Sequence, residues 1–158
     1  MYTSRLNRAV ETAEIISGFD QTDARFRKVD DLVERDFKKF EGQLWNKMDE
    51  ALEEHNLTDY NDLDIEPIDN VKRRLRSFLK NLQHNLIVEN IQTDNILIVT
   101  HGEIFSVLLE LMLETSANLN SNVKSVQFPY WPRNLQIAKL LFQSDSFNLV
   151  DIDFSFDS

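Results

Sequence analysis

A histidine stands directly behind an apolar run near the middle of the chain. Residues 96–99 are all aliphatic, which is typical of a strand buried on both faces, and Thr100, His101 and Gly102 follow at once. Apolar residues at three- and four-residue spacing then predict a helix from Ile104. In open α/β sheets, ligands bind beyond the carboxyl end of a strand, and the amide groups at the start of the next helix favour an anion such as phosphate. Gly102 would let the backbone approach that anion or take a positive φ, although the same residues could form a plain turn.

Two arginines near the amino end could bind the same anion. We predict a helix from Arg5 to Ser17, with Ser4 as its N-cap and Gly18 as its C-cap. Arg5 and Arg8 then lie in the first turns, where a cation opposes the helix dipole but is useful if an anion binds there. The alternative interpretation is that both arginines are solvated surface residues.

An acidic side chain occurs in a segment that is unusually rich in both charge and apolar residues. Residues 32–42 include Glu34 among several lysines, acids and phenylalanines. Such a segment is typical of a loop that holds an acid near a site, but an ordinary surface loop would have the same composition.

The overall composition limits the class of protein and of partner. The chain has 158 residues, 42% of them hydrophobic and 28% charged, which predicts a single domain over residues 1–158. It has no cysteine, and no leader or membrane span is visible, so we expect a cytoplasmic protein without a cysteine-based metal site. A net charge of −10 argues against binding to nucleic acid or to an anionic membrane. A phosphorylated substrate would therefore need a local group of arginines.

Further strands and helices must position these side chains. We predict short extended segments over residues 1–4 and 26–29, a short helix over 44–55 and the longest helix over 70–88. Two extended runs, 135–142 and 147–154, read as an antiparallel hairpin. The long helix carries basic residues that we interpret as a solvated face rather than a site for an acidic partner: Lys72, Arg73, Arg74, Arg76 and Lys80.

Four segments, in order along the chain, resemble motifs of the histidine phosphatase (phosphoglycerate-mutase-like) superfamily. Residues 3–13 resemble its Ser-x-Leu-x-Arg-Ala-x-x-Thr-Ala motif, and residues 32–42 resemble Leu-x-Glu-Arg-x-Phe-Gly-x-x-Glu-Gly. Residues 98–102 resemble Val-(Ser/Thr)-His-Gly, and residues 134–138 resemble Asn-x-x-(Ile/Val) at a strand start. The first and third segments are most similar to the fungal and plant acid-phosphatase-like branch.

The resemblance implies a fold and a set of roles. The fold would be a three-layer α/β fold of the phosphoglycerate-mutase type, with a mostly parallel sheet flanked by helices. The activity would be cleavage of phosphomonoesters through a phosphohistidine, without cofactor or metal. Arg8 matches the pocket arginine, His101 the second pocket histidine, and Glu34 the acid that protonates the leaving oxygen. Beside these, Ser4, Arg5 and Gly102 are expected to contact a phosphorylated small molecule.

One motif of that superfamily is not found in the sequence. The nucleophilic histidine of the family lies in an Arg-His-Gly segment before the first of these motifs. We therefore expect an N-terminally truncated domain that lacks the first strand and first helix and is inactive as this chain. His55 and His84 are expected to be exposed helix residues rather than replacements, and Lys38 stands where the family has a glycine.

The missing strand has a structural consequence and leaves alternatives open. The strand at 96–100 is expected to have an unpaired apolar edge, which a second copy of the chain or another partner would cover. Besides a phosphatase that is inactive as this chain, the chain could be a non-catalytic pseudophosphatase or fragment that binds anions or a protein. An unrelated α/β binding module is a third alternative. The substrate, and the choice between phosphatase and mutase, stay open.

Overall fold

The computed structural model describes residues 1–43, 46–88, 95–114, 139–142 and 149–153. The longer elements follow one another as β1 (Tyr2–Ser4), α1 (Asn7–Ser17), β2 (Arg27–Val29), α2 (Asn46–Glu54), α3 (Ile68–Val88), β3 (Ile98–Val99), α4 (Gly102–Glu114), β4 (Lys139–Phe142) and β5 (Leu149–Asp153). Three short 3₁₀ helices, η1 (Asp30–Leu32), η2 (Lys38–Phe40) and η3 (Tyr60–Asp62), lie between β2 and α3.

The central sheet has the strand order β2-β1-β3, and all its strands are parallel. Tyr2 lies opposite Arg27 on one side and Ile98 on the other. β1, the first of these strands in the chain, lies in the middle of the sheet and pairs with β2 on one side and β3 on the other. Within the described part of the chain β3 is therefore an edge strand, as the sequence predicted.

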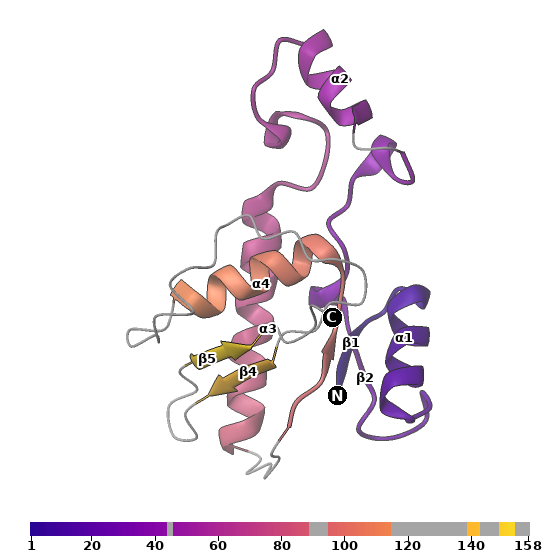
Figure 1. The fold of residues 1–158 in the computed structure, drawn as a ribbon, viewed down its shortest axis with the longest axis vertical. Coiled ribbons are helices and arrows are strands. Elements are labelled where there is room, and N and C mark those ends of the chain that lie inside the picture. The colour runs from indigo at the N-terminus through magenta and orange to yellow at the C-terminus, as the bar shows by residue number, and fades with distance from the viewer. Residues whose placement is uncertain (44–45, 89–94, 115–138, 143–148, 154–158) are drawn as a thin grey trace.

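Helices cover both faces of this sheet (Figure 1). On one face, α1 packs through Ala9, Val10 and Ala13, and Val99 of β3 belongs to the same cluster. On the other face, α3 and α4 form the larger core, and Ile98 packs against it. Neighbouring residues of β3 thus point to opposite apolar layers, because side chains alternate along a strand. The predicted α/β class with a parallel sheet between helices is confirmed.

The last two strands form a separate antiparallel pair. β4 and β5 are hydrogen-bonded to each other, with Lys139 opposite Asp153 and an irregularity between Leu141 and Phe142. This confirms the predicted hairpin for the part that is described. The motif at residues 134–138 lies outside the described residues.

The predicted start of α1 is wrong in detail, and one of the two reasons offered for Gly102 at the start of α4 is excluded. α1 begins at Asn7 rather than at Arg5, and its N-cap is Leu6, without a side-chain cap. Ser4 instead ends β1, and its hydroxyl oxygen accepts a hydrogen bond from the Leu6 N–H at 3.3 Å. Gly102 is the first residue of α4 and takes a helical conformation, so a positive φ is not the reason for this glycine.

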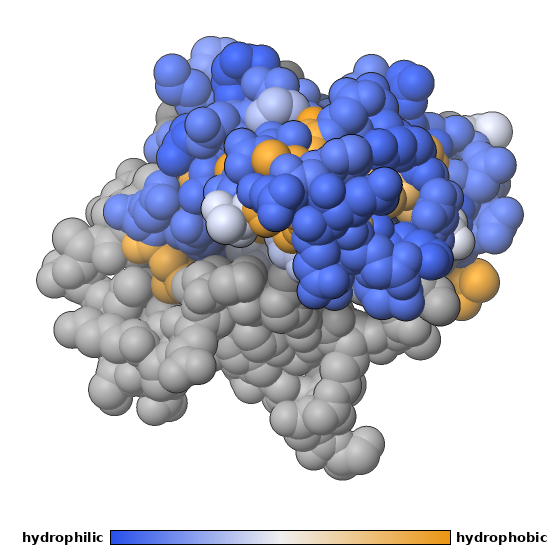
Figure 2. Space-filling view, turned by 90° about the horizontal axis from the view of Figure 1, so that it is seen from above, coloured by the Kyte–Doolittle hydropathy of each residue, from blue (hydrophilic) through white to orange (hydrophobic). Residues whose placement is uncertain are grey.

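A smaller apolar cluster lies in the segment between β2 and α3. It joins Phe40, Met48, Leu63 and Ile65, and α2 rests on it at the far end of the molecule from the β4–β5 pair (Figure 1). Seen from this end, the described surface is mostly hydrophilic, with only scattered apolar side chains (Figure 2). Among the described helices, none has the length and apolar character needed to cross a bilayer.

Candidate active site

The carboxyl ends of the parallel strands bring polar side chains together at one edge of the sheet. Ser4 ends β1, η1 follows β2 directly at Asp30, and His101 follows β3 after Thr100. In a parallel sheet these ends meet at the same edge, where ligands bind in open α/β folds. The side chains of Ser4 and His101 are both buried there, with 0% and 8% of their surface exposed.

Both ring nitrogens of His101 have a partner. Nε2 lies 2.7 Å from the hydroxyl oxygen of Ser4, and Nδ1 accepts a hydrogen bond of 3.2 Å from Nε of Arg8. Because a guanidinium can only donate, Nδ1 must carry the lone pair, and the proton of the neutral ring sits on Nε2. His101 therefore donates to Ser4 and is held in a single tautomer.

The charge state of His101 follows from its surroundings. Burial, together with the positive charges of Arg8 and Arg74, lowers the pKa of His101 from 6.5 to about 4. The imidazole is therefore neutral at pH 7, and its one N–H, on Nε2, is the group that donates to Ser4.

Arg8 reaches His101 from the first turns of α1. Ala9 and Val10 fix this helix on the sheet, which leaves Arg8 on its exposed side at the strand ends. In the described part of the chain its two terminal nitrogens make no hydrogen bond, so the guanidinium can bind a phosphate through them. The pairing of Arg8 with His101 brings together two residues that are 93 positions apart.

Glu34 lies beside this pair and has an unusual environment. Burial raises the pKa of Glu34 above its ordinary 4.5, and the negative charge of Glu103 acts in the same direction. Hydrogen bonds from the N–H groups of Arg35 (3.0 Å) and Ile104, and the charge of Arg8, act against this shift. A carboxyl with a raised pKa is suited to donate a proton to a leaving group.

Two contacts hold the segment that carries Glu34. The Thr100 hydroxyl donates to the backbone oxygen of Leu32 at 2.8 Å and so ties η1 to the end of β3. Arg35 is buried and donates to the Glu103 carboxylate (2.8 Å), to the backbone oxygen of Glu66 (2.6 Å) and to the Asn61 amide oxygen (2.9 Å). Arg35 thus fixes the backbone next to Glu34 against α4 and against the start of α3.

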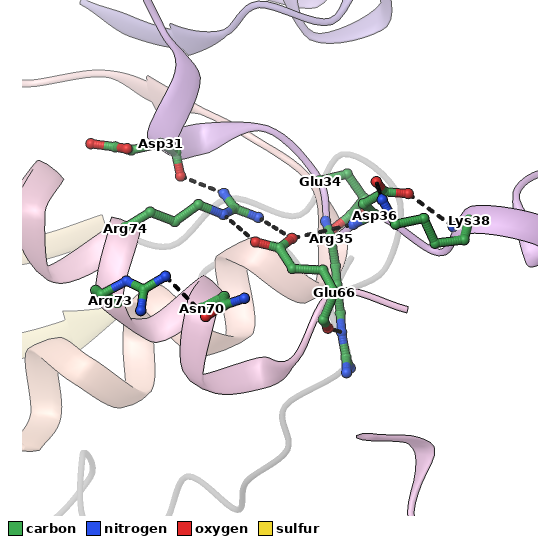
Figure 3. Close-up of polar contacts among 9 residues, drawn as sticks. All are labelled: Asp31, Glu34, Arg35, Asp36, Lys38, Glu66, Asn70, Arg73 and Arg74. Carbon is green, nitrogen blue, oxygen red and sulfur yellow. Dashed lines mark hydrogen bonds and ion pairs between the residues drawn. The ribbon is translucent and has the colours of Figure 1, made fainter. Parts of the chain in front are cut away.

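A hollow of about 550 Å³ opens next to Glu34, and Arg5 lies on its wall. Its polar lining comes from Arg5 and from two longer parts of the chain, residues 30–38 and 65–74, and Figure 3 shows polar contacts of these two longer parts. Arg74 of α3 donates from two nitrogens to the two carboxylate oxygens of Glu66, at 3.1 Å each. It also donates to the backbone oxygen of Asp31 at 2.6 Å. Glu34 lines this hollow and also lies within the electrostatic influence of Arg8, the partner of His101.

The structure brings most of the predicted site residues together. Arg8 and Ser4 each contact His101, and Gly102 is exposed at the start of α4, next to His101 in the chain. Arg5 is the outlier, since its side chain is 62% exposed and pairs with Asp30 at 3.0 Å.

The other two histidines lie elsewhere, as expected. His84 is exposed on α3, whereas His55 is exposed in the turn that follows α2. In the described part of the chain, no group of three or more histidine and acidic side chains is arranged to hold a metal ion.

The sequence analysis did not predict that two arginines, Arg35 and Arg74, lie near the site. Arg35 follows Glu34 in the second motif, and this adjacency was the only signal for it. Arg74 was placed among the solvated basic residues of the long helix, but its side chain is only 18% exposed. Its position four residues after Asn70 and one before the buried Leu75 is compatible with either face, so the helical pattern did not separate it from its neighbours.

Comparison with known proteins gives one family and one fold. Residues 1–153 match the profile of the histidine phosphatase superfamily (branch 1). The solved structure of YhfR from Bacillus stearothermophilus is similar, with a TM-score of 0.62 and 22% sequence identity over 94% of this chain and 69% of that chain. At this identity the likeness concerns the fold alone. No curated protein matches the chain in sequence.

Proposed function

The chain belongs to the histidine phosphatase superfamily, as its motifs predicted, and we propose that its site transfers the phosphoryl group of phosphomonoesters. Its small parallel sheet between helices is consistent with the phosphoglycerate-mutase-like fold. The observation that carries the proposal is the contact between Arg8 and His101 beside Glu34, a carboxyl whose pKa is raised. Within the superfamily, we infer from the first and third motif segments that fungal and plant acid-phosphatase-like proteins are the nearest relatives.

Each group has a role that its chemistry supports. The guanidinium of Arg8 binds two phosphoryl oxygens, and the Nε2–H of neutral His101 exchanges its partner Ser4 for a phosphoryl oxygen as negative charge develops there. The bond between phosphorus and the alcohol oxygen breaks while an attacking imidazole forms a bond to phosphorus. Glu34 gives its proton to the departing alcohol and then, as a carboxylate, removes a proton from the water that releases phosphate. Ser4, Gly102 and Arg5 are candidate contacts to the substrate.

We further propose that the attacking imidazole is not one of the three histidines in this sequence. Nδ1 of His101 is occupied by Arg8, and its Nε2 carries the proton and faces Ser4. His55 and His84 are exposed on other parts of the chain. The 158 residues then provide the arginine, the acid and the donor imidazole, and should bind phosphate without turning over an ester.

Two measurements on the 158-residue chain test this proposal. Titration calorimetry should detect binding of inorganic phosphate in wild type and its loss in Arg8→Gln. Hydrolysis of p-nitrophenyl phosphate should stay at the rate without protein. Hydrolysis that disappears in His101→Ala would mean that His101 attacks phosphorus, and the assignment of the nucleophile would be wrong. Absence of phosphate binding in wild type would remove the proposed site itself.

A further inference from the structure

The hollow beside Glu34 is placed to receive the alcohol part of the substrate. Its lining includes Glu34 itself, and the charge of Arg8, which donates to His101, acts on this carboxyl. A group that Glu34 protonates must sit between the phosphorus and the hollow, since a general acid has to reach the leaving oxygen. The inference below therefore rests on the proposed function, and it concerns which leaving groups the hollow accepts.

Three cationic side chains line the hollow, and each is already paired with a carboxylate. Arg5 pairs with Asp30 at 3.0 Å, and Lys38 pairs with Asp36 at 2.5 Å. Arg74 holds both oxygens of Glu66, and this pair is the most shielded one, with side chains 18% and 19% exposed. Figure 3 shows the Arg74–Glu66 and Lys38–Asp36 pairs, in each of which the cation points to its own carboxylate partner.

The described lining therefore offers no cation without a carboxylate partner. Three of its four acidic side chains are paired with the three cations, and Glu34, the proton donor of the proposed function, has no ion pair among the described residues. A second phosphate or a carboxylate on the leaving group would have to compete with Asp30, Asp36 or Glu66 for a cation. This competition costs free energy, above all at the shielded Arg74–Glu66 pair, because like charges repel at close range.

We propose that this hollow selects phosphomonoesters whose alcohol part is uncharged or cationic, such as polyol or amino-alcohol phosphates. It selects against esters that carry a second anionic group. The hydroxyl groups of a polyol can use the outer lone pairs of the paired carboxylates and the Asn70 side chain without disturbing any pair. An ammonium group can donate to the same carboxylates.

Binding measurements separate this selectivity from phosphate binding itself. Calorimetric titration of the 158-residue chain would use inorganic phosphate, glycerol phosphate, phosphoethanolamine and phosphoglycerate. Glycerol phosphate and phosphoethanolamine should bind at least as tightly as inorganic phosphate, and phosphoglycerate about tenfold more weakly than glycerol phosphate, as expected for about 1.4 kcal/mol of repulsion. Equal affinity for glycerol phosphate and phosphoglycerate would overturn the inference while leaving the phosphate site intact. Failure of all four compounds to bind would instead overturn the proposed function and the inference with it.

Variants that release a cation test the cause of the selectivity. Glu66→Gln releases Arg74, and Asp36→Asn releases the exposed Lys38, so both should narrow the gap between glycerol phosphate and phosphoglycerate by about threefold to tenfold. The matched control is Glu50→Gln, which releases Lys47 from a similar exposed pair on α2, away from the hollow, and should leave the gap unchanged. A gap that stays the same in both hollow variants, or narrows equally in the control, would overturn the inference. Asp36 is exposed, so this variant should fold even if Glu66→Gln does not.

Discussion

Nε of Arg8 donates a hydrogen bond to Nδ1 of His101 over 3.2 Å, and this contact sets the chemistry of the site. It fixes the imidazole in the tautomer with the proton on Nε2, and the arginine charge helps to keep that ring neutral. Among the described residues, the two terminal nitrogens of Arg8 have no partner. In the proposed function, one side chain thus both prepares the histidine and binds the phosphate.

A comparison of two substitutions at Arg8 tests the importance of its planar fork. Arg8→Lys keeps the charge but can neither bind two oxygens in parallel nor reach Nδ1 in the same geometry. We expect Arg8→Lys to weaken binding of inorganic phosphate about tenfold and Arg8→Gln to weaken it further, because charge-assisted bonds contribute about 1.5–3 kcal/mol. Calorimetry measures both affinities. Arg25→Gln is the control, since Arg25 is also exposed but lies before β2, at the opposite edge of the sheet. An Arg8→Lys variant that binds like wild type would show that charge alone is sufficient.

The pKa of His101 predicts how stability depends on pH. The unfolded chain gains a proton on this group below pH 6.5, whereas the folded chain gains it only below about pH 4. The unfolded state binds more protons in this window, so the free energy of unfolding falls as the pH drops through it. The contribution of His101 is about 3 kcal/mol at most.

Urea denaturation at a series of pH values between 7 and 4 measures this effect. His101→Gln lacks the titrating group, so its unfolding free energy should fall less steeply than that of wild type over the same window. His84→Gln replaces an exposed histidine on α3 and should keep the wild-type slope. Parallel curves for wild type and His101→Gln would contradict the buried, neutral state of His101.

Glu34 should destabilise the fold at neutral pH, because its carboxylate is buried. Glu34→Gln keeps an oxygen for the N–H groups of Arg35 and Ile104 but removes the charge. We expect the variant to be more stable than wild type by up to about 1 kcal/mol at pH 7. The gain should vanish below pH 4.5, where the wild-type carboxyl is protonated in both states.

The same denaturation experiment distinguishes this effect from a general benefit of removing negative charge. Glu53→Gln removes an exposed carboxylate from α2 and should change stability much less. Phosphate affinity should not fall in Glu34→Gln, since an ionised Glu34 repels an anion and the protonated form is needed only during turnover. A variant that is less stable than wild type at pH 7 would show that the carboxylate is well solvated or paired.

Sequence patterns were sufficient for the parts of the site that follow from strand ends. Parallel strands end at one edge, so an apolar run followed by His101 and a short strand followed by the helix of Arg8 predict that the two meet. The position of Glu34 could also be predicted, although only through the motif that surrounds it. The strand-end rule did not predict the contact between Ser4 and His101. A serine before a helix has the same local sequence pattern whether it caps that helix or, as here, contacts a histidine.

Contacts that depend on side-chain direction across distant elements were beyond the sequence. Arg74 belongs to a run of basic residues on α3, and only the packing of that helix against η1 turns it toward Asp31 and Glu66. Arg35 follows the acid in a charged segment, and nothing local indicates that it is buried. Arg35 bonds to the backbone oxygen of Glu66, 31 residues away, and Arg74 bonds to that of Asp31, 43 residues away.

The pair formed by Arg35 and Glu103 is the most buried ion pair near the site. Their side chains are 7% and 12% exposed, and the second carboxylate oxygen of Glu103 has no hydrogen-bond partner among the described residues. Loss of Arg35 would therefore leave Glu103 buried with no compensating charge. It would also release the backbone next to Glu34 from α4 and from the start of α3.

Arg35→Met should accordingly destabilise the protein by about 3–5 kcal/mol, the range found when one partner of a buried pair is removed. The double variant Arg35→Met/Glu103→Met replaces both charges by apolar groups of similar length and should recover most of that loss, because it leaves no unpaired charge. Urea denaturation measures both. Lys47→Met breaks the exposed Lys47–Glu50 pair on α2 and should cost less than about 1 kcal/mol. A double variant as unstable as Arg35→Met would show that the three hydrogen bonds of Arg35, rather than charge compensation, hold this part of the site together.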